Sequence, residues 1–295
     1  MTALADQTVK PPARTFGEKV NRFFGRAPVH VALIVIALIW LLPTVGLLIT
    51  SFRPRSEIQS SGWWTVFSGN LDFTLENYQQ VLTEQSMLQA FINSVSITIP
   101  STILPVLLAS MAAFAFAWVR FPFRDTLFLG VIAMLLIPSQ MTFIPLSQLI
   151  RSTGVGGTFL PIWLIHTAFA LPFGIFLLRN FFITLPKDLI EAARIDGAGN
   201  IDIFRRIVIP LSVPALASYG IFQFLWTWND LLMALVFAPR SGQPMTVQVS
   251  NLLGTYGTEW YILAAASFLI MVVPLAVFFS LQRYFVQGLL AGSVK

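Results

Sequence analysis

Long runs of uncharged, mostly apolar residues divide the chain and predict its main elements. Five of these runs hold 23 to 35 consecutive residues without Asp, Glu, Lys or Arg, and a sixth, from Arg206 to Arg240, is interrupted only by Asp230. A helix needs about 20 apolar residues to cross the hydrocarbon core of a bilayer. The pattern therefore predicts six transmembrane helices, near residues 28–51, 88–118, 126–148, 159–180, 211–237 and 260–283.

The composition favours an all-α protein that crosses a membrane several times. Of the 295 residues, 56% are hydrophobic and only 11% are charged, too little charge to cover the surface of a soluble domain of this length. The first apolar run is too long for a signal-peptide core and lacks a small-residue cleavage site, so we expect it to be retained. We predict a basic tail over 1–27, a transmembrane domain over 28–285 and a C-terminal tail over 286–295.

The distribution of Lys and Arg predicts the orientation in the membrane. If both ends of the chain lie in the cytoplasm, 14 of the 18 basic residues face that side, as the positive-inside rule requires. We therefore predict a multi-pass protein of a bacterial cytoplasmic membrane with both termini cytoplasmic. The formal net charge is +5, but the basic residues form no stripe or cluster, so we expect membrane lipid and no nucleic acid as a partner.

Prolines are frequent in and beside the predicted spans. Each removes a backbone hydrogen bond and kinks or breaks a helix, which membranes tolerate where neighbouring helices or a wet cavity satisfy the freed groups. A transport pathway needs such irregular helices, and a merely packed bundle also tolerates them, so both interpretations stay open. The prolines concerned are Pro43, Pro100, Pro105, Pro138, Pro145, Pro161, Pro172, Pro214 and Pro274.

The cytoplasmic loop between the fourth and fifth spans, residues 182–210, carries clear helix-boundary signals. Pro186 suits a first helical turn, and the two acidic residues after it favour the positive end of a helix. Arg194 falls in the last turn, and Gly197 fits a left-handed C-terminal cap. We therefore expect a short helix over 187–196.

A second short helix should follow in the same loop, capped by Asn200 and ended by Pro210. The small side chains of Ala192 and Ala193 would let the first helix press closely into a groove on another protein. A plain amphipathic cytoplasmic loop explains the same residues. From the residues alone, both interpretations stay open.

The spacing in this loop resembles the EAA motif of importer-type ABC permeases, E-A-A-x3-G-x9-I-x-L-P, with Ile209 in place of the usual Leu. The resemblance implies the type I ABC importer transmembrane fold. It also implies that the loop is a coupling helix docking on an ATP-hydrolysing subunit. The residues expected at that contact are Asp188, Glu191, Ala192, Ala193, Arg194 and Gly197.

Further motifs resemble the maltose-transporter G-type (MalG-like) permeases, a group that handles di- and oligosaccharides, polyols and glycerol phosphate compounds. The final eight residues and a Leu-Ala-Ala-Ala-Ser-Phe stretch are similar to α-glucoside-type members. The resemblance implies two ATPase subunits that bind ATP and Mg²⁺, a second MalF-like permease subunit and a solute-binding protein. The other matching motifs are Asn93-Ser94, Phe121-Pro122-Phe123 and Trp228-Asn229-Asp230.

Polar groups in the fifth predicted span are candidates for contact with a solute. Gln223, Thr227 and Asp230 share one helical face, flanked by Trp226 and Asn229. Amide, carboxylate and indole groups suit sugars, whose hydroxyls need hydrogen bonds and whose C–H faces stack on aromatic rings. Packing explains them as well: Asp230 would cap or bond a neighbouring helix, and the tryptophans would anchor at the interface.

Several kinds of chemistry are excluded or unsupported. The chain has no cysteine, hence no disulfide, thiolate metal site or cysteine nucleophile. Its two histidines, His30 and His166, are too few for an imidazole metal site, and we expect them to be packing residues. Because no G-x-x-x-x-G-K-[ST] motif occurs, we predict a transport subunit that is not an enzyme and has no cofactor of its own.

We therefore predict a permease subunit that moves a di- or oligosaccharide by alternating access, with α-glucosides as a candidate class. Import of glycerol-3-phosphate or a polyol is the alternative within the family, although a phosphate would favour Arg or Lys in the pathway and the spans bury none. An ion-coupled secondary transporter, with Asp230 as the coupling group, is the alternative from another class, and it leaves the EAA spacing unexplained. A non-transporting membrane scaffold leaves the polar, proline-broken spans unexplained.

Overall fold

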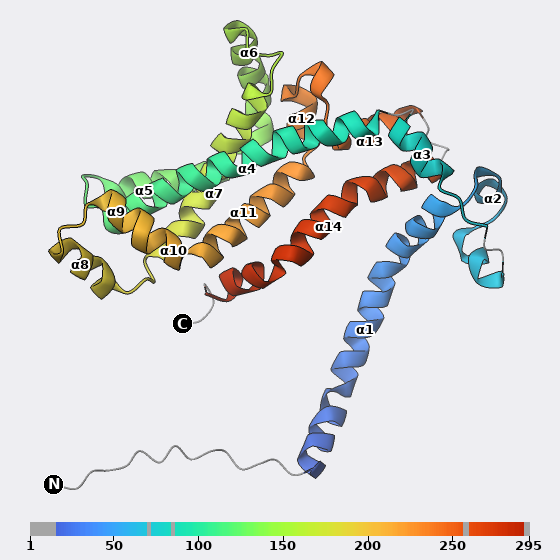
Figure 1. Ribbon diagram of the computed structural model, residues 1–295, viewed down its shortest axis with the longest axis horizontal. Helices are drawn as coiled ribbons and strands as arrows, with labels where there is room; N and C mark the ends of the chain where they lie inside the picture. Colours follow the sequence, from blue (N-terminus) through green and yellow to red (C-terminus); the bar gives the residue numbers. More distant parts are fainter. Residues whose placement is uncertain (1–15, 70–71, 84–85, 256–259, 292–295) are drawn as a thin grey trace.

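The computed structural model describes residues 16–69, 72–83, 86–255 and 260–291, and every regular element among them is a helix (Figure 1). Residues 1–15 of the predicted basic tail and the last four residues lie outside these ranges. Four helices can each cross a membrane unbroken, and two bent helix pairs add up to two more spans, so the chain has up to six. The all-α, polytopic fold is confirmed. The four helices that can each cross a membrane unbroken are α1 (Phe16–Phe52), α4 (Met87–Trp118), α7 (Leu160–Phe182) and α14 (Trp260–Ala291).

The third span is a bent pair rather than one straight helix over 126–148. Its two halves meet at 90°. Ile137 is extended at the bend, with ψ 116°, because the ring of the following Pro138 disfavours helical backbone in the residue before it. The pieces are α5 (Arg124–Ala133), η2 (Met134–Leu136), η3 (Ser139–Thr142) and α6 (Phe143–Thr153).

The fifth span is also broken, and the short helix before it differs from the prediction. Asn200 is the first helical residue rather than the cap, a position that Gly199 takes. The helix does not end at Pro210: a π-helical turn precedes it, and the 77° bend comes at Ser212. Proline has no N–H to donate within a helix, and the wider π-helical turn before Pro210 fits this missing hydrogen bond. The pieces are α9 (Asn200–Ile203), η4 (Phe204–Val208), α10 (Ile209–Leu211), α11 (Val213–Trp228) and α12 (Leu232–Phe237).

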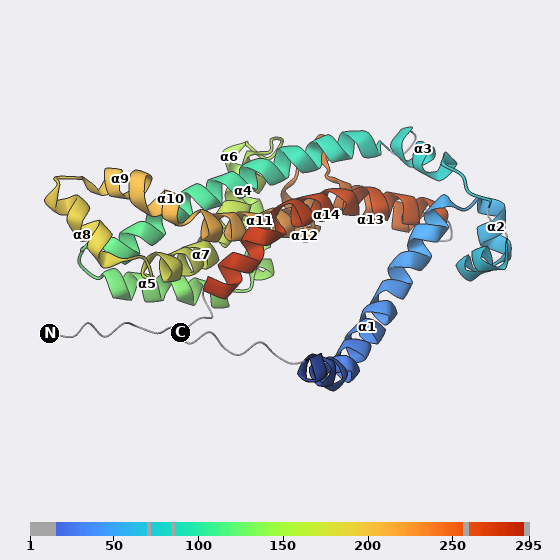
Figure 2. The same cartoon turned by 60° about the horizontal axis from the view of Figure 1, so that its bottom comes forward.

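Four helices form the body of the molecule. α4 packs along α7, and α11 packs against α4, α7 and α14 (Figures 1 and 2). The approach of α7 to α11 depends on Gly174, where a Cβ atom would lie 2.3 Å from the ring of Tyr219. The Tyr219 hydroxyl donates a 2.9 Å hydrogen bond to the carbonyl of Ala170 on α7. A glycine and a buried tyrosine thus fix how closely these two spans pack.

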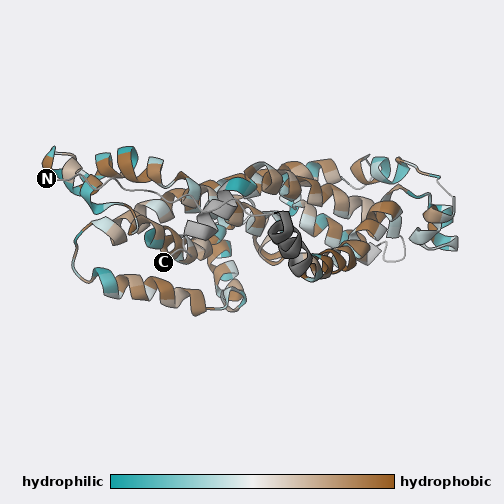
Figure 3. Cartoon of the chain, turned by 90° about the horizontal axis from the view of Figure 1, so that it is seen from below, coloured by the Kyte–Doolittle hydropathy of each residue, from teal (hydrophilic) through white to brown (hydrophobic). Residues whose placement is uncertain are grey.

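Polar segments gather at the two ends of this body, and the long helices between them are hydrophobic (Figure 3). One end carries α8 (Lys187–Ile195) and α9. The opposite end carries α2 (Arg55–Ser60), η1 (Trp63–Ser68) and α3 (Glu76–Thr83). Another short helix, α13 (Met245–Thr255), leads into α14. Such a belt between two polar ends is what a bilayer-spanning bundle requires.

The end that carries α2 is held to α1 by buried polar groups. Arg53, only 1% exposed, donates a 2.6 Å hydrogen bond to the Ser61 hydroxyl and forms an ion pair with Glu57 at 3.4 Å. The Asn77 amide donates to the carbonyls of Ser51 and Arg53, both at 2.9 Å. A buried arginine must be paired to be tolerated, so these contacts fix the fold of this segment and make it an ordered structure rather than a loose loop.

Helix α1 stands apart from the other spans. It contacts α14 and then leads away from the bundle (Figure 1). Only 6% of the most hydrophobic 18-residue stretch of α1 is buried, and Trp40 is 79% exposed. Its apolar surface must therefore be covered by lipid or by another protein.

Candidate functional site

The short helix predicted over 187–196 is present as α8 and ends at Ile195, with Pro186 as its N-cap rather than in its first turn. α8 begins at Lys187 after Pro186. Gly197 adopts the left-handed conformation, with φ +83°, which confirms the expected C-terminal cap. The Ala198 N–H donates to the Ala193 carbonyl at 2.9 Å and the Gly197 N–H to the Arg194 carbonyl at 3.1 Å. These bonds satisfy carbonyls that a helix end leaves free.

One side of α8 is fixed to the ends of the membrane spans. Ile190 is 1% exposed and belongs to a cluster that includes Phe114 of α4 and Phe182 of α7. Arg194 Nη2 donates a 2.7 Å hydrogen bond to the carbonyl of Trp118, the last residue of α4. A displacement of α8 must therefore pull on these helix ends or break the contacts.

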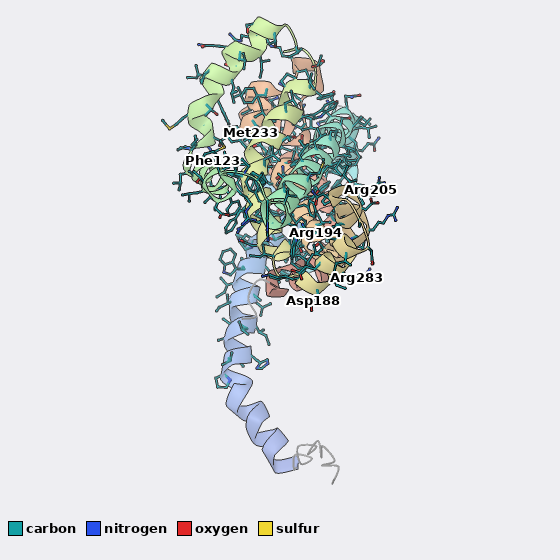
Figure 4. The ribbon with its side chains drawn as sticks, turned by 90° about the vertical axis from the view of Figure 1, so that its left-hand side faces the viewer. Phe123, Asp188, Arg194, Arg205, Met233 and Arg283 are labelled. Atoms are coloured by element: carbon teal, nitrogen blue, oxygen red, sulfur yellow. The ribbon has the colours of Figure 1, made fainter. Side chains whose placement is uncertain are left out.

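The other side of α8 faces away from the bundle. Asp188, Glu191, Ala192 and Gly197 are exposed, whereas Ala193 is half-buried against the cluster. Ile195, at the end of the helix, is 86% exposed. Figure 4 looks onto this end of the molecule and shows Asp188, Arg194 and Arg205 gathered there. The exposed side of α8 thus presents both charged and apolar side chains.

The polar residues predicted in the fifth span have different roles in the structure. Gln223 is buried and donates its side-chain N–H groups to the Ser101 carbonyl at 3.2 Å and to the Thr227 hydroxyl at 3.1 Å. Asn229 is exposed and donates to the Leu225 carbonyl, which closes the end of α11. Thr227 and Asn229 therefore support the local structure rather than face a cavity.

Asp230 lies in the break between α11 and α12. Its Oδ2 accepts a 3.1 Å hydrogen bond from the Ala234 N–H, so it caps α12 as one of the packing interpretations proposed. The same oxygen lies 3.9 Å from His166 Nε2 on α7, too far for a hydrogen bond. The structure thus brings His166, which we expected to be a packing residue, next to the carboxylate of the broken span.

A cavity of about 460 Å³ opens beside this pair. Gln223 and Trp226 line it, as does His166; Thr227, Asn229 and Asp230 do not. Its other walls are the bend of the third span, α7 and Met233 of α12, which Figure 4 labels. No signal in the sequence could have placed His166 here, because the contact depends on how two distant spans pack.

Two matching motifs prove to be structural. Asn93 Nδ2 donates to the Gln243 carbonyl at 3.0 Å, and the Met245 N–H donates to the Ser94 hydroxyl at 2.9 Å, so the pair holds the start of α13 against α4. Trp228 is buried, and its Nε1 donates to the Ile270 carbonyl of α14 at 3.0 Å. It is therefore a core residue and not an interfacial anchor. Among the described residues, no three His, Asp or Glu side chains lie close enough to hold a metal ion.

Comparison with protein families and curated relatives gives consistent matches. The family model described as "binding-protein-dependent transport system inner membrane component" matches residues 105–290. The osmoprotective compounds uptake permease protein GgtD of Synechocystis sp. is 52% identical, over 93% of this chain and 94% of its own length. The alpha-glucoside transport system permease protein AglG of Rhizobium meliloti is 38% identical, over 90% of this chain and 96% of its own.

A solved structure has the same fold over nearly the whole chain. A chain in the crystal structure of a bacterial alginate ABC transporter, in complex with an alginate pentasaccharide-bound periplasmic protein, aligns with a TM-score of 0.63. The alignment covers 92% of this chain and 96% of that one, at 15% sequence identity.

Proposed function

The chain belongs to the family of binding-protein-dependent transport system inner membrane components, and from this premise we propose that it is a permease subunit of an ATP-driven importer for neutral sugars or glycosides. The proposal includes a cytoplasmic position for α8 and both termini. The observation that carries it is the two-sided helix α8. Its inner side is fixed to the spans, and its outer side presents exposed residues of the EAA motif.

The two sides of α8 suggest how ATP would drive transport. We infer that an ATPase subunit receives the exposed side in a groove, as in helix-in-groove recognition. Closure of two ATPase subunits would then displace α8. Because Ile190 and Arg194 tie α8 to the ends of α4 and α7, the displacement would tilt these spans and open the pathway to the other side. The chain itself would hydrolyse nothing and bind no cofactor, and ATP and Mg²⁺ would be held by the ATPases.

Two further partners belong to the proposal. A solute-binding protein would deliver the solute at the end that carries α2 and α3. A second, MalF-like permease would complete the pathway and cover part of the apolar surface that α1 exposes. The alginate transporter, whose fold this chain shares, is described in complex with a periplasmic protein that carries the solute.

The solute class is inferred from relatives and from chemistry. Relatives carry names for the transport of alpha-glucosides and of trehalose. The described cavity is lined by no Arg or Lys, the groups that a phosphate would favour. We therefore propose a neutral glycoside in preference to glycerol-3-phosphate, with a polyol as the nearest alternative.

The coupling role can be tested with Ile195→Asp. Ile195 is 86% exposed, so the substitution should leave the fold intact while it places a charge in the proposed groove. We expect the ATPase subunits to be lost when the complex is purified in mild detergent. ATP-driven uptake of labelled trehalose, maltose or sucrose should fall at least tenfold.

Leu75→Asp is the matched control, because Leu75 is 68% exposed at the opposite end of the molecule. It should keep the ATPase subunits bound. Normal ATPase binding and uptake in Ile195→Asp would contradict the proposed coupling surface. Uptake that a protonophore abolishes while ATP is maintained would favour the ion-coupled transporter instead.

A further inference from the structure

We propose that the cavity beside His166 binds a sugar ring of the transported solute, with His166 as a hydrogen-bonding group and Trp226 as part of a stacking wall. The inference rests on the proposed function and extends it to a solute site within this subunit. It assigns to His166 a role that its place in an apolar run did not suggest.

The walls of the cavity are irregular in all three spans that form it. The third span bends by 90° at Pro138 beside the cavity. α7 contributes Pro172, whose missing N–H leaves the Ala168 carbonyl without its helical donor. α11 ends just beyond Trp226, and Met233 follows in α12. Broken helices at membrane depth are tolerated where they are buried in protein or line a wet cavity, and transporters build their solute sites from them.

A buried polar group without a partner lies in this wall. His166 is 2% exposed, and its Nε2 has no hydrogen-bond partner among the described residues. A buried polar atom left unsatisfied costs about 1–3 kcal/mol, so it is a place where a hydroxyl of a ligand would be stabilised. Gln223, which also lines the cavity, uses its two N–H groups elsewhere, so only its carbonyl oxygen is left to bond a ligand hydroxyl.

An aromatic wall runs beside these polar groups. Phe173 of α7 lies 5.0 Å from Phe222 of α11, and Phe222 lies 5.9 Å from Trp226, measured between ring centroids. All three line the cavity, and Trp226 is 58% exposed. Sugars present C–H faces that stack on such rings and hydroxyls that need hydrogen bonds.

The size and charge of the cavity fit a neutral ligand. Its volume of about 460 Å³ falls in the range of roughly 300–1,000 Å³ that small-molecule sites occupy. The charged group nearest to His166 in the described structure, Asp230, is already used to cap α12. A lipid chain cannot form hydrogen bonds with the His166 imidazole and the Gln223 amide, whereas the hydroxyls of a polyhydroxylated solute can.

This chain contains no cysteine, so one introduced thiol can report on occupancy of the cavity in a complete transporter whose partner subunits have had their own cysteines replaced. Thr142→Cys places one thiol on the wall formed by the third span. In the purified complex we expect this thiol to react with a charged methanethiosulfonate reagent. The reaction should slow at least fivefold with whichever of trehalose, maltose, sucrose or methyl α-glucoside the wild-type complex transports fastest.

Thr184→Cys is the control, because Thr184 is exposed in the turn before α8 and lies outside the cavity. Its thiol should react at the same rate with and without the glycoside. A Thr142→Cys thiol that never reacts would show that lipid or a partner helix fills the cavity. A thiol that reacts at an unchanged rate with the glycoside would show an empty, wet cavity. Both results would overturn the proposal.

Substitutions of the wall give a second readout. His166→Leu and Trp226→Ala should lower glycoside uptake about fivefold, the effect of losing one hydrogen bond or stacking contact. The ATPase response to the loaded binding protein should remain, because α8 is unchanged. His166→Gln and Trp226→Phe should restore part of the uptake.

Phe279→Ala removes a similarly exposed aromatic side chain, 60% exposed on α14 and outside the cavity, and should not affect uptake. Equal uptake by wild type, His166→Leu and Trp226→Ala would contradict the solute site while leaving the proposed function in place. Failure of the wild-type complex to take up any of the four glycosides would instead contradict the proposed function.

Discussion

A single backbone conformation at Gly197 holds the end of α8 in place. With φ +83° the residue lies in the left-handed region, and a Cβ atom there would meet no atom within 4 Å. Gly197→Ala would therefore add conformational strain of about 1 kcal/mol without a clash. We expect solute uptake to fall about fivefold, since 1.4 kcal/mol corresponds to a factor of ten. Initial uptake rates of the reconstituted complex measure this.

Gly199→Ala is a matched control for that prediction, because Gly199 has φ −73° and its nearest neighbour, Asp202 Oδ2, would lie 4.0 Å from a Cβ atom. It should be close to wild type. Gly197→Asn should be intermediate, since asparagine tolerates the left-handed region better than alanine. Equal uptake in Gly197→Ala and Gly199→Ala would mean that the cap geometry has no part in coupling.

Residues whose role is local were predictable, and residues whose role depends on packing were not. Gly197 follows a helix with clear ends, so its conformation could be predicted from its neighbours in sequence. Asp230 caps the helix that begins just after it, which was one of the two interpretations. His166 acquires its neighbour from a span more than sixty residues away, and the sequence contains no signal for that contact.

Among the elements, α8 has a contact to α4 that the EAA pattern did not indicate. Arg194 was expected at the contact with the ATPase, which stays a prediction; in addition, its Nη2 donates to the Trp118 carbonyl at 2.7 Å. Arg194→Gln should weaken the tie between the two helices by about 1 kcal/mol. We expect less solute moved per ATP hydrolysed, by about fivefold, with the ATPase subunits still bound. Simultaneous measurement of uptake and phosphate release gives this ratio.

Arg205→Gln is the matched control, because Arg205 is an exposed arginine on the same segment between α7 and α11. It should keep the wild-type ratio of solute to ATP. Arg194→Lys should retain part of the coupling, since the ammonium can reach the carbonyl without the planar geometry of the guanidinium. An unchanged ratio in Arg194→Gln would show that the bond to α4 transmits no motion.

The positions of the spans were predictable from the lengths of uncharged runs, but their breaks were not. Pro138 and Pro214 lie at bends, whereas Pro100, Pro105 and Pro172 lie inside continuous helices. The break before α12 contains no proline at all. Neighbouring helices can satisfy the carbonyls that a proline frees, so the effect of a proline on a span also depends on the tertiary packing.

At the scale of the whole molecule, the charge pattern and the two polar ends lead to one topology. The segment that carries α8 lies at one end of the hydrophobic body, and the segment that carries α2 and α3 lies at the other (Figures 2 and 3). The sequence could not predict that α1 leaves the bundle, because an apolar helix covered by protein and one covered by lipid have the same composition. The sequence does predict that these two polar segments lie at opposite ends, because three predicted spans separate them along the chain.

This topology predicts opposite labelling of two single-cysteine variants of the cysteine-free chain. Ser60→Cys, exposed on α2, should react in intact spheroplasts with a maleimide that cannot cross the membrane. Thr184→Cys, exposed just before α8, should react only after the membrane is permeabilised. The physical reason is the excess of Lys and Arg on the α8 side, which the translocation machinery retains in the cytoplasm. If Thr184→Cys were labelled from outside and Ser60→Cys were protected, α8 could not reach a cytoplasmic ATPase, and the proposed coupling would be untenable.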